Sequence, residues 1–211
     1  EAYQLSKENL LGTPPNVRSH QTFGDLLLTY KWQEDVGSYT RDLSLNTGIS
    51  RTSYDIGENH IVQEVFASAP ADLMVIHIQA ENPFDLDLQM TREKDAQIEY
   101  FADGSILMSG QIIDPEQPNR GPAGAHMKFA SKASLKYKDG TIEKTESGLS
   151  CKSIKELSIY LTAETNYDIN QLNFTESINP TSVCEEKILA LESTSYEKIK
   201  KEHIKDHSSI F

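Results

Sequence analysis

Two histidines near the C-terminal end are spaced so that both could bind one metal ion. His203 and His207 are four positions apart in HIKDH, which on a helix presents two imidazoles to a metal ion. A metalloprotease helix carries glutamate directly after the first histidine, but Ile204 stands there. Spacing nominates no third ligand, so we interpret the pair as part of an ordinary amphipathic helix face. The other histidines are assigned to structural or exposed positions: His20, His60, His77 and His126.

Carboxylates are plentiful, because 32 of the 211 side chains are acidic. A glycosidase needs one acid with a raised pKa and a partner carboxylate across a sugar-sized gap. The sequence singles out no such pair, since Asp85 and Asp87 alternate with leucines, as on an exposed strand face. Four glutamates are likewise assigned to a solvated surface: Glu58, Glu64, Glu143 and Glu146.

Nucleophile, phosphate and sugar-binding motifs are equally weak. Ser109-Gly110 lacks the preceding glycine of a nucleophile elbow, and no glycine-rich phosphate loop occurs. Four aromatic residues could stack on a sugar, although core packing explains their spacing equally well: Trp32, Tyr39, Tyr54 and Tyr100. The sequence therefore predicts no catalytic, cofactor-binding or metal-binding residue, and no cofactor.

Composition excludes several partners. Twenty basic against 32 acidic side chains give a formal net charge of −12, which argues against nucleic acid and against a polybasic membrane contact. The longest apolar stretches are strand-sized, so no segment is expected to span a bilayer. With 37% hydrophobic and 25% charged residues, the chain has the composition of a folded domain.

The two cysteines say little about the fold. Cys151 and Cys184 are 33 positions apart, without a CxxC motif. We favour two reduced, half-buried thiols over a disulfide, because free cysteine commonly packs as a small hydrophobe.

The elements that would position these groups are mostly strands. Hydrophobic residues alternate with polar ones over 72–80, 129–137 and 157–163, a period of two that indicates strands with one face on a core. Asp103-Gly104 and Asp139-Gly140 mark tight hairpin turns. Further strands are predicted at 24–31, 39–45, 49–56, 60–68, 85–92, 96–101, 106–113 and 141–146. This pattern predicts a mainly β fold, an antiparallel sandwich.

Helices are expected at both ends. Residues 1–11 favour a short helix ended by Gly12. Near the C-terminal end, Ser182 with Glu185 and Thr194 with Glu197 fit the capping-box spacing. The second of these helices carries an apolar stripe with nothing evident to pack on, and we expect its partner to lie beyond the chain: Tyr196, Ile199, Ile204 and Phe211.

The order of several segments resembles the N-terminal domain of glycoside hydrolase family 95, the α-L-fucosidase type. The matching segments are HQTFGDLLLTY (20–30), SYTRDLSLNTGISRTSY (38–54), QEVFASAPADLMVIHI (63–78), AHMKFASKASLKYKDGTI (125–142), IYLTAETNYD (159–168) and HIKDHSSIF (203–211). The departures are mild: His20 and His207 stand where tyrosine is usual, Thr22-Phe23 where Pro-Leu is usual, and Gln63 where arginine is common.

The resemblance implies a non-catalytic piece of a longer, inverting α-L-fucosidase acting on fucosylated glycans such as α-1,2-linked L-fucosides. Residues 1–180 would be the N-terminal β-sandwich domain, an antiparallel β super-sandwich that lacks its first strands here. Residues 181–211 would be a helical linker towards an absent (α/α)6 barrel, which holds the catalytic groups and is the expected partner. By resemblance, the enzyme would be secreted or periplasmic.

One loop and three alternatives complete the expectations. The Pro/Gly-rich loop 114–124 could lend Asn119 and Arg120 to the rim of the barrel's cleft, where they would hydrogen-bond sugar hydroxyls. The alternatives are a free-standing carbohydrate-binding sandwich, the N-terminal domain of a related α-glucoside phosphorylase, and that of an α-L-galactosidase.

Overall fold

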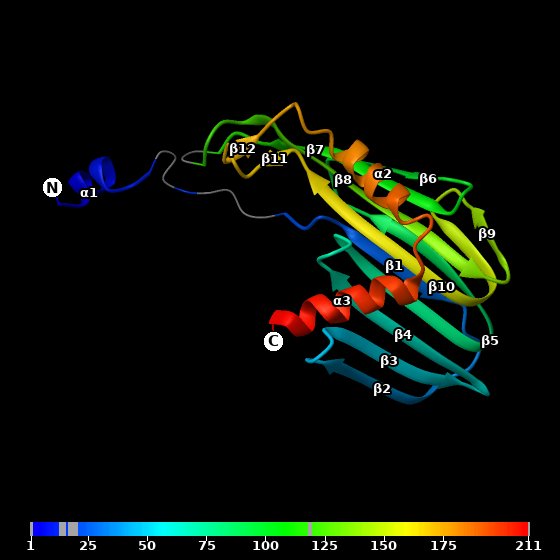
Figure 1. Cartoon of the computed structure of the whole chain (residues 1–211). Coiled ribbons are helices and arrows are strands. Elements are labelled where there is room, and N and C mark those ends of the chain that lie inside the picture. The colour runs from blue at the N-terminus through cyan, green and yellow to red at the C-terminus, as the bar shows by residue number, and fades with distance from the viewer. Residues whose placement is uncertain (1, 13–15, 17–20, 118–119, 211) are drawn as a thin grey trace.

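Antiparallel strands make up most of the molecule, which confirms the mainly β fold class. The computed structural model describes residues 2–12, 16, 21–117 and 120–210 (Figure 1). The strands are β1 (Asp25–Tyr30), β2 (Val36–Ser44), β3 (Ile49–Ile56), β4 (Asn59–Ser68), β5 (Leu73–Thr91), β6 (Ala96–Tyr100), β7 (Ser105–Asp114), β8 (Gly124–Lys138), β9 (Thr141–Lys144), β10 (Leu149–Thr165), β11 (Tyr167–Asp168) and β12 (Asn173–Phe174). The helices are α1 (Ala2–Asn9), α2 (Pro180–Ala190) and α3 (Tyr196–Ile210).

Two long strands, β5 and β10, belong to both layers of a sandwich. The larger layer has the order β2–β3–β4–β5–β10–β8–β7–β6. In it, β5 contributes its first half and β10 its second half. The other halves pair with each other and with β1 and β9, which gives a smaller layer of order β1–β5–β10–β9. Every one of these pairings is antiparallel.

Irregular pairing marks the point where the strands pass between layers. The register of β10 against β5 shifts between Cys151 and Ile154, and again before Glu156. Ser153 has a φ of 55°, and its N–H donates to an oxygen of Asp85 at 2.7 Å. Such bulges bend a strand and let it switch sheets. The segments predicted as separate strands at 72–80 and 85–92 are therefore one strand.

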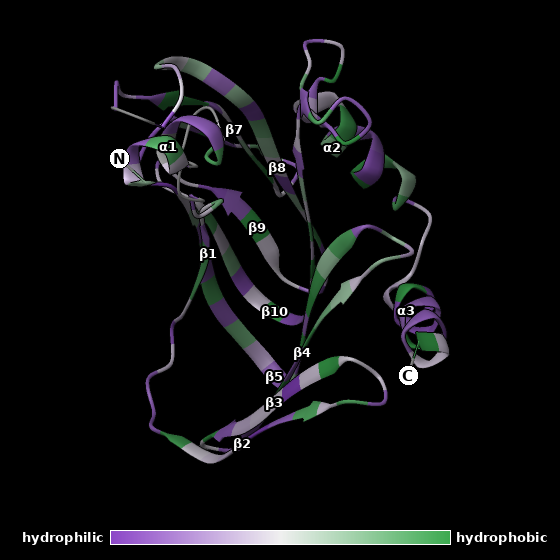
Figure 2. Ribbon diagram, turned by 90° about the vertical axis from the view of Figure 1, so that its left-hand side faces the viewer, coloured by the Kyte–Doolittle hydropathy of each residue, from purple (hydrophilic) through white to green (hydrophobic). Residues whose placement is uncertain are grey.

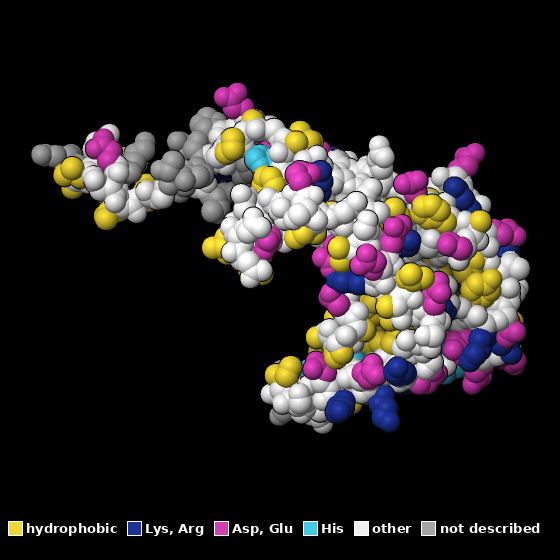
Figure 3. Space-filling model, turned by 45° about the horizontal axis from the view of Figure 1, so that its top comes forward, with side chains coloured by type: hydrophobic (Ala, Val, Ile, Leu, Met, Phe, Trp, Pro, Cys, Tyr) yellow, Lys and Arg dark blue, Asp and Glu magenta, His cyan; other side chains and the backbone are white. Residues whose placement is uncertain are grey.

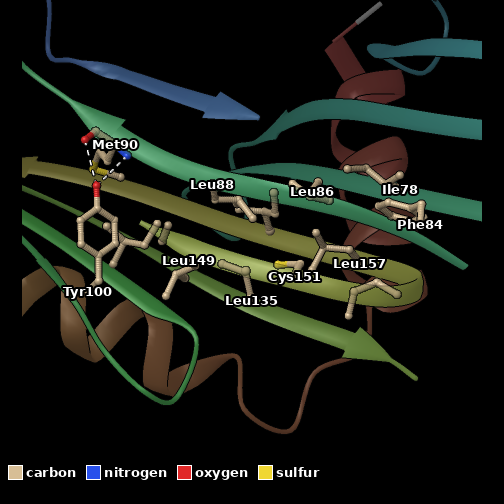
Figure 4. Close-up of a cluster of buried hydrophobic side chains, with 14 of the residues drawn as sticks. Ile78, Phe84, Leu86, Leu88, Met90, Tyr100, Leu135, Leu149, Cys151 and Leu157 are labelled. Carbon is tan, nitrogen blue, oxygen red and sulfur yellow. Dashed lines mark hydrogen bonds between the residues drawn. The ribbon is translucent and has the colours of Figure 1, made fainter. Parts of the chain in front are cut away.

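The main core fills the space between the two layers (Figure 4). Its fully buried side chains come from both, for example Leu86 and Leu149 from the smaller layer and Ile106 and Ile159 from the larger one. Tyr100 ties the layers together, because its hydroxyl donates to the carbonyl of Met90 and accepts from the same residue's N–H, both at 3.2 Å.

A second apolar cluster covers the outer face of the larger layer, under α2 and α3. Ile199 of α3 is 1% exposed and packs there with Phe66, Val75 and Tyr160. The expectation that the stripe of α3 needs a partner beyond the chain is therefore wrong, since the sheet itself is the partner. Phe211 lies outside the described residues.

The helix starts also differ from the predicted capping boxes. The N-cap of α2 is Asn179, whose side-chain oxygen accepts from the N–H groups of Thr181 and Ser182, so Ser182 lies inside the helix. At α3 the hydroxyl of Ser195 accepts from the N–H of Lys198 at 3.3 Å. Each prediction missed because a neighbouring polar side chain could serve equally well.

The N-terminal helix α1 stands away from the sandwich (Figure 1). The predicted hairpin at Asp139-Gly140 is wrong. Both residues have positive φ, 59° and 73°, but the turn joins β8 to β9, which pair with different parts of β10 and not with each other. At this turn the chain passes from the larger layer to the smaller one. Within the described parts of the chain, no helix is long and apolar enough to cross a membrane.

Candidate docking surface

The inner face of the larger layer is covered at one end and open at the other. Four residues in register form one row across it: Ile159, Ile76, Val65 and Leu43, with Ser50 between the last two. Ile159 is 0% exposed, Ile76 and Val65 are half-buried, and Leu43 is 59% exposed. Burial therefore decreases steadily from β10 to β2, because the smaller layer does not extend over β2 to β4 at this end.

The neighbouring row repeats this gradient. Ala133 on β8 is 0% exposed, its partner Leu161 is half-buried, and Met74 on β5 is 42% exposed. Ala67, the partner of Met74 on β4, is exposed. We call the apolar residues at the open end of both rows the open patch: Leu43, Val65, Ala67 and Met74. Figure 2 shows β2 and β3 at the far end of the sheet from β7 and β8, with apolar segments along these strands.

The edge of the smaller layer on the same side of β5 as β4 carries little protection. Among the described residues β1 pairs only with β5, and after Asp25 its sequence, DLLLTY, has three consecutive leucines and neither a further charge nor a proline. Two of the other edges carry protection: β9 is short with Glu143 and Lys144, and β2 has a register shift between Gly37 and Thr40. Edge strands without charge, bulge or proline readily pair with further strands.

Charges of both signs are interspersed over the face of the molecule that Figure 3 shows. This face is hollowed between the lobe carrying β12 and the lobe carrying the end of α3.

A polar groove of about 500 Å³ lies between α2 and β8. Its lysines are engaged, because Lys132 lies 3.5 Å from Glu185 and Lys136 donates to the carbonyls of Leu191, Glu192 and Thr194.

The sequence-based candidates are scattered. Arg120 is exposed in its loop, and Asn119 lies outside the described residues. His203 is buried against Phe66, while His207 Nε2 meets the carbonyl of Leu45 at 2.8 Å. No group of three or more metal-ligating side chains occurs in the described ranges.

The aromatic candidates separate into two groups. Trp32 lies against Tyr54, which also faces Tyr39, with ring centroids 6.3 and 6.4 Å apart. Trp32 and Tyr54 belong to the main core, whereas Tyr39 is 59% exposed. Tyr100 lies elsewhere, on β6. Core packing therefore accounts for three of the four, Trp32, Tyr54 and Tyr100.

One assignment to a solvated surface is wrong, that of Glu64. Its side chain is 17% exposed and lies under α3. The carboxylate accepts hydrogen bonds from the Tyr196 hydroxyl and the Lys200 ammonium. Burial opposes ionisation of Glu64, but the hydrogen bonds from Lys200 and Tyr196 hold its pKa below the usual range. Burial, with the carboxylate nearby, raises the pKa of Tyr196. The cluster attaches α3 to the sheet.

Both cysteines are free and fully buried, 0% exposed rather than half-buried as expected. Burial raises the pKa of Cys151 to about 12 and that of Cys184 to about 11. Neither thiol is therefore a nucleophile at neutral pH.

The fold defines a mainly antiparallel β-domain, and the sequence shows which kind. The family profile described as "Glycosyl hydrolase family 65, N-terminal domain" matches residues 1–170. The chain belongs to this family of N-terminal domains.

The curated relatives are alpha-fucosidases. Alpha-L-fucosidase 2 of Arabidopsis thaliana is 25% identical over 100% of this chain and 27% of its own length. Probable alpha-fucosidase A of Aspergillus niger is 24% identical over 96% of this chain and 26% of its own length. The chain thus spans about a quarter of these relatives. These matches confirm the predicted resemblance to the N-terminal domain of a fucosidase-type glycoside hydrolase.

Among solved structures, a protein described as a kojibiose phosphorylase from human microbiome aligns over 86% of this chain and 27% of its own, with a TM-score of 0.52 and 9% identity. At that identity the likeness shows the fold alone.

Proposed function

We propose that this chain is the non-catalytic N-terminal β-domain of an α-L-fucosidase-type glycoside hydrolase and that it braces the (α/α)6 catalytic barrel. The observation that carries the proposal is the alignment of the whole chain with about a quarter of an alpha-L-fucosidase. The hydrolysis is assigned to the barrel, where an acid and a partner carboxylate would flank the sugar.

The open patch and the edge of β1 support a surface that other parts of the same polypeptide cover. Strands added beside β1 would extend the smaller layer over β4, β3 and β2, because neighbouring strands lie about 4.8 Å apart and the two layers face each other. Exposed leucine and methionine in register with buried core residues would then become buried.

Hydrolysis tests the assignment of activity. The complete protein should release L-fucose from an α-1,2-linked fucoside, and the 211-residue chain should release none. Fucose release by the chain alone would contradict the proposal. So would glycan binding by the chain together with an inactive complete protein, because that result indicates a carbohydrate-binding module.

A pair of matched substitutions tests the covered surface. Leu43, in the open patch, is 59% exposed, and Leu189, on α2, is 62% exposed. In the complete protein Leu43→Glu should lower the free energy of unfolding by about 2 kcal/mol or more, because it places a carboxylate among apolar side chains. Leu189→Glu should change it little. Both should be nearly neutral in the 211-residue chain, and equal effects in the complete protein would contradict a covered patch.

A further inference from the structure

A row of stacked rings holds α3 on the outer face of the sheet. The ring of His77, on β5, lies parallel to that of Tyr196, on α3, with centroids 3.6 Å apart. Phe66, on β4, lies 6.2 Å from Tyr196 and 4.6 Å from His203 of α3. Two histidines, one from the sheet and one from the helix, therefore lie inside the contact.

Both histidines are almost completely buried, and in each one ring nitrogen has no partner within the described part of the chain. His77 is 3% exposed, and its Nδ1 lies 2.8 Å from the hydroxyl of Ser158. His203 is 4% exposed. In both rings Nε2 is buried without a hydrogen-bond partner among the described residues. A neutral ring tolerates this, but an imidazolium would hold a buried N–H without an acceptor and a positive charge away from water.

We propose that α3 is an acid-released clasp: protonation of His77 and His203 detaches the helix and uncovers the apolar outer face of the sheet. The released face includes Phe66 and Val75. This inference concerns a movement within the chain and stands independently of the proposed enzyme.

The charged groups around each ring have opposite effects on its protonation. His77 is faced by the carboxylates of Glu64, Glu156 and Glu197, which favour its charged form, and by Lys200, which opposes it. His203 is faced by Asp206 and by the backbone at Thr47 and Gly48, which favour the charged form, and by His207, which opposes it. Burial outweighs the favourable groups, so the pKa of each histidine lies below its ordinary value.

The direction of the pH effect follows from linkage. A released histidine titrates near pH 6.5, and the docked ring titrates lower. The docked state is therefore fully favoured above about pH 6.5 and loses stability as the pH falls towards the docked pKa values. Within that window each histidine shifts the ratio of released to docked helix by up to about tenfold per pH unit, so the pair shifts it by up to about a hundredfold.

Hydrogen exchange of the α3 amides tests the clasp, after correction for the intrinsic effect of pH. In the wild-type chain, protection of α3 should fall by tenfold or more between pH 7 and pH 5. The double variant His77→Phe/His203→Phe keeps two flat rings and should lose most of this dependence. The control His60→Gln, at a side chain 42% exposed outside the contact, should behave as wild type.

A titration of the wild-type chain keeps the proposal testable if the double variant fails to fold. Proton or carbon resonances of the two imidazoles should titrate below pH 6.5. Titration of both rings at or above pH 6.5 would overturn the proposal, and so would α3 protection that is equal at pH 7 and pH 5.

Discussion

Shortening Ile199 to alanine should destabilise the chain through the attachment of α3. The side chain is 1% exposed in the outer cluster. The substitution removes three carbon groups, each worth about 0.8 kcal/mol of burial, or ~2.4 kcal/mol together. The cavity left behind brings the expected loss in the free energy of unfolding to about 3 kcal/mol. For a chain of this length that corresponds to a decrease of about 6–12 °C in Tm.

The same helix supplies a matched control. Ile210 is 74% exposed, so Ile210→Ala makes the identical chemical change without leaving a cavity and should alter stability by less than about 0.5 kcal/mol. Urea titration followed by circular dichroism measures both variants. If the two isoleucines gave equal losses, the buried contact of α3 would be refuted.

Detachment of the helix sets a ceiling on this loss. A helix that can leave the sheet loses at most the free energy that docks it, and the core between the layers then stays folded. Exchange of the α3 amides distinguishes the two cases, because detachment unprotects α3 alone whereas global unfolding unprotects β10 as well.

Three further outcomes follow from the contacts. The thiols of Cys151 and Cys184 should resist labelling at pH 8 in the folded chain, and both should react after denaturation; rapid native labelling would contradict their burial. Lys136→Met should cost about 1–3 kcal/mol in urea denaturation, because its ammonium donates to the carbonyls that follow α2, whereas Lys138→Met, at an exposed ion pair, should cost below about 1 kcal/mol. Asn179→Ala should cost about 1 kcal/mol through the lost N-cap, and an unchanged urea midpoint would contradict its role.

Strand positions could be predicted because alternation is a local property of the sequence. Strand β5 shows over what length of chain this alternation holds. Its inward residues keep one phase from Met74 through Ile78 and Leu86 to Met90. Asn82 interrupts the apolar series, so the sequence predicts two strands, 72–80 and 85–92, although the unchanged phase is compatible with the one continuous strand of the structure. In β10 the inward phase breaks near Ile154, which corresponds to the bulges that move the strand between layers.

The partner of α3 was missed because only one face of each strand was considered. Residues 73–78, LMVIHI, are apolar on both faces, which is typical of a strand buried on two sides. The outward residues Leu73 and Val75 therefore need a cover, and α3 belongs to the cluster that supplies it. The acid–base environment of His77 could not be predicted, since it depends on residues brought together from β4, β10 and α3.

The open patch is a case in which periodicity alone decides nothing. Met74 lies in phase with Ile76 and Ile78, so alternation assigns all three to the core, yet their exposure ranges from 42% to 0%. The difference lies in the second layer, because β1 ends the smaller sheet while the larger one continues through β4 and β3 to β2. Alternation specifies which face of a strand turns inward. The number of strands that face it depends on pairings between segments distant in the sequence, and Leu43→Glu in the complete protein tests whether further residues cover the open patch, as proposed above.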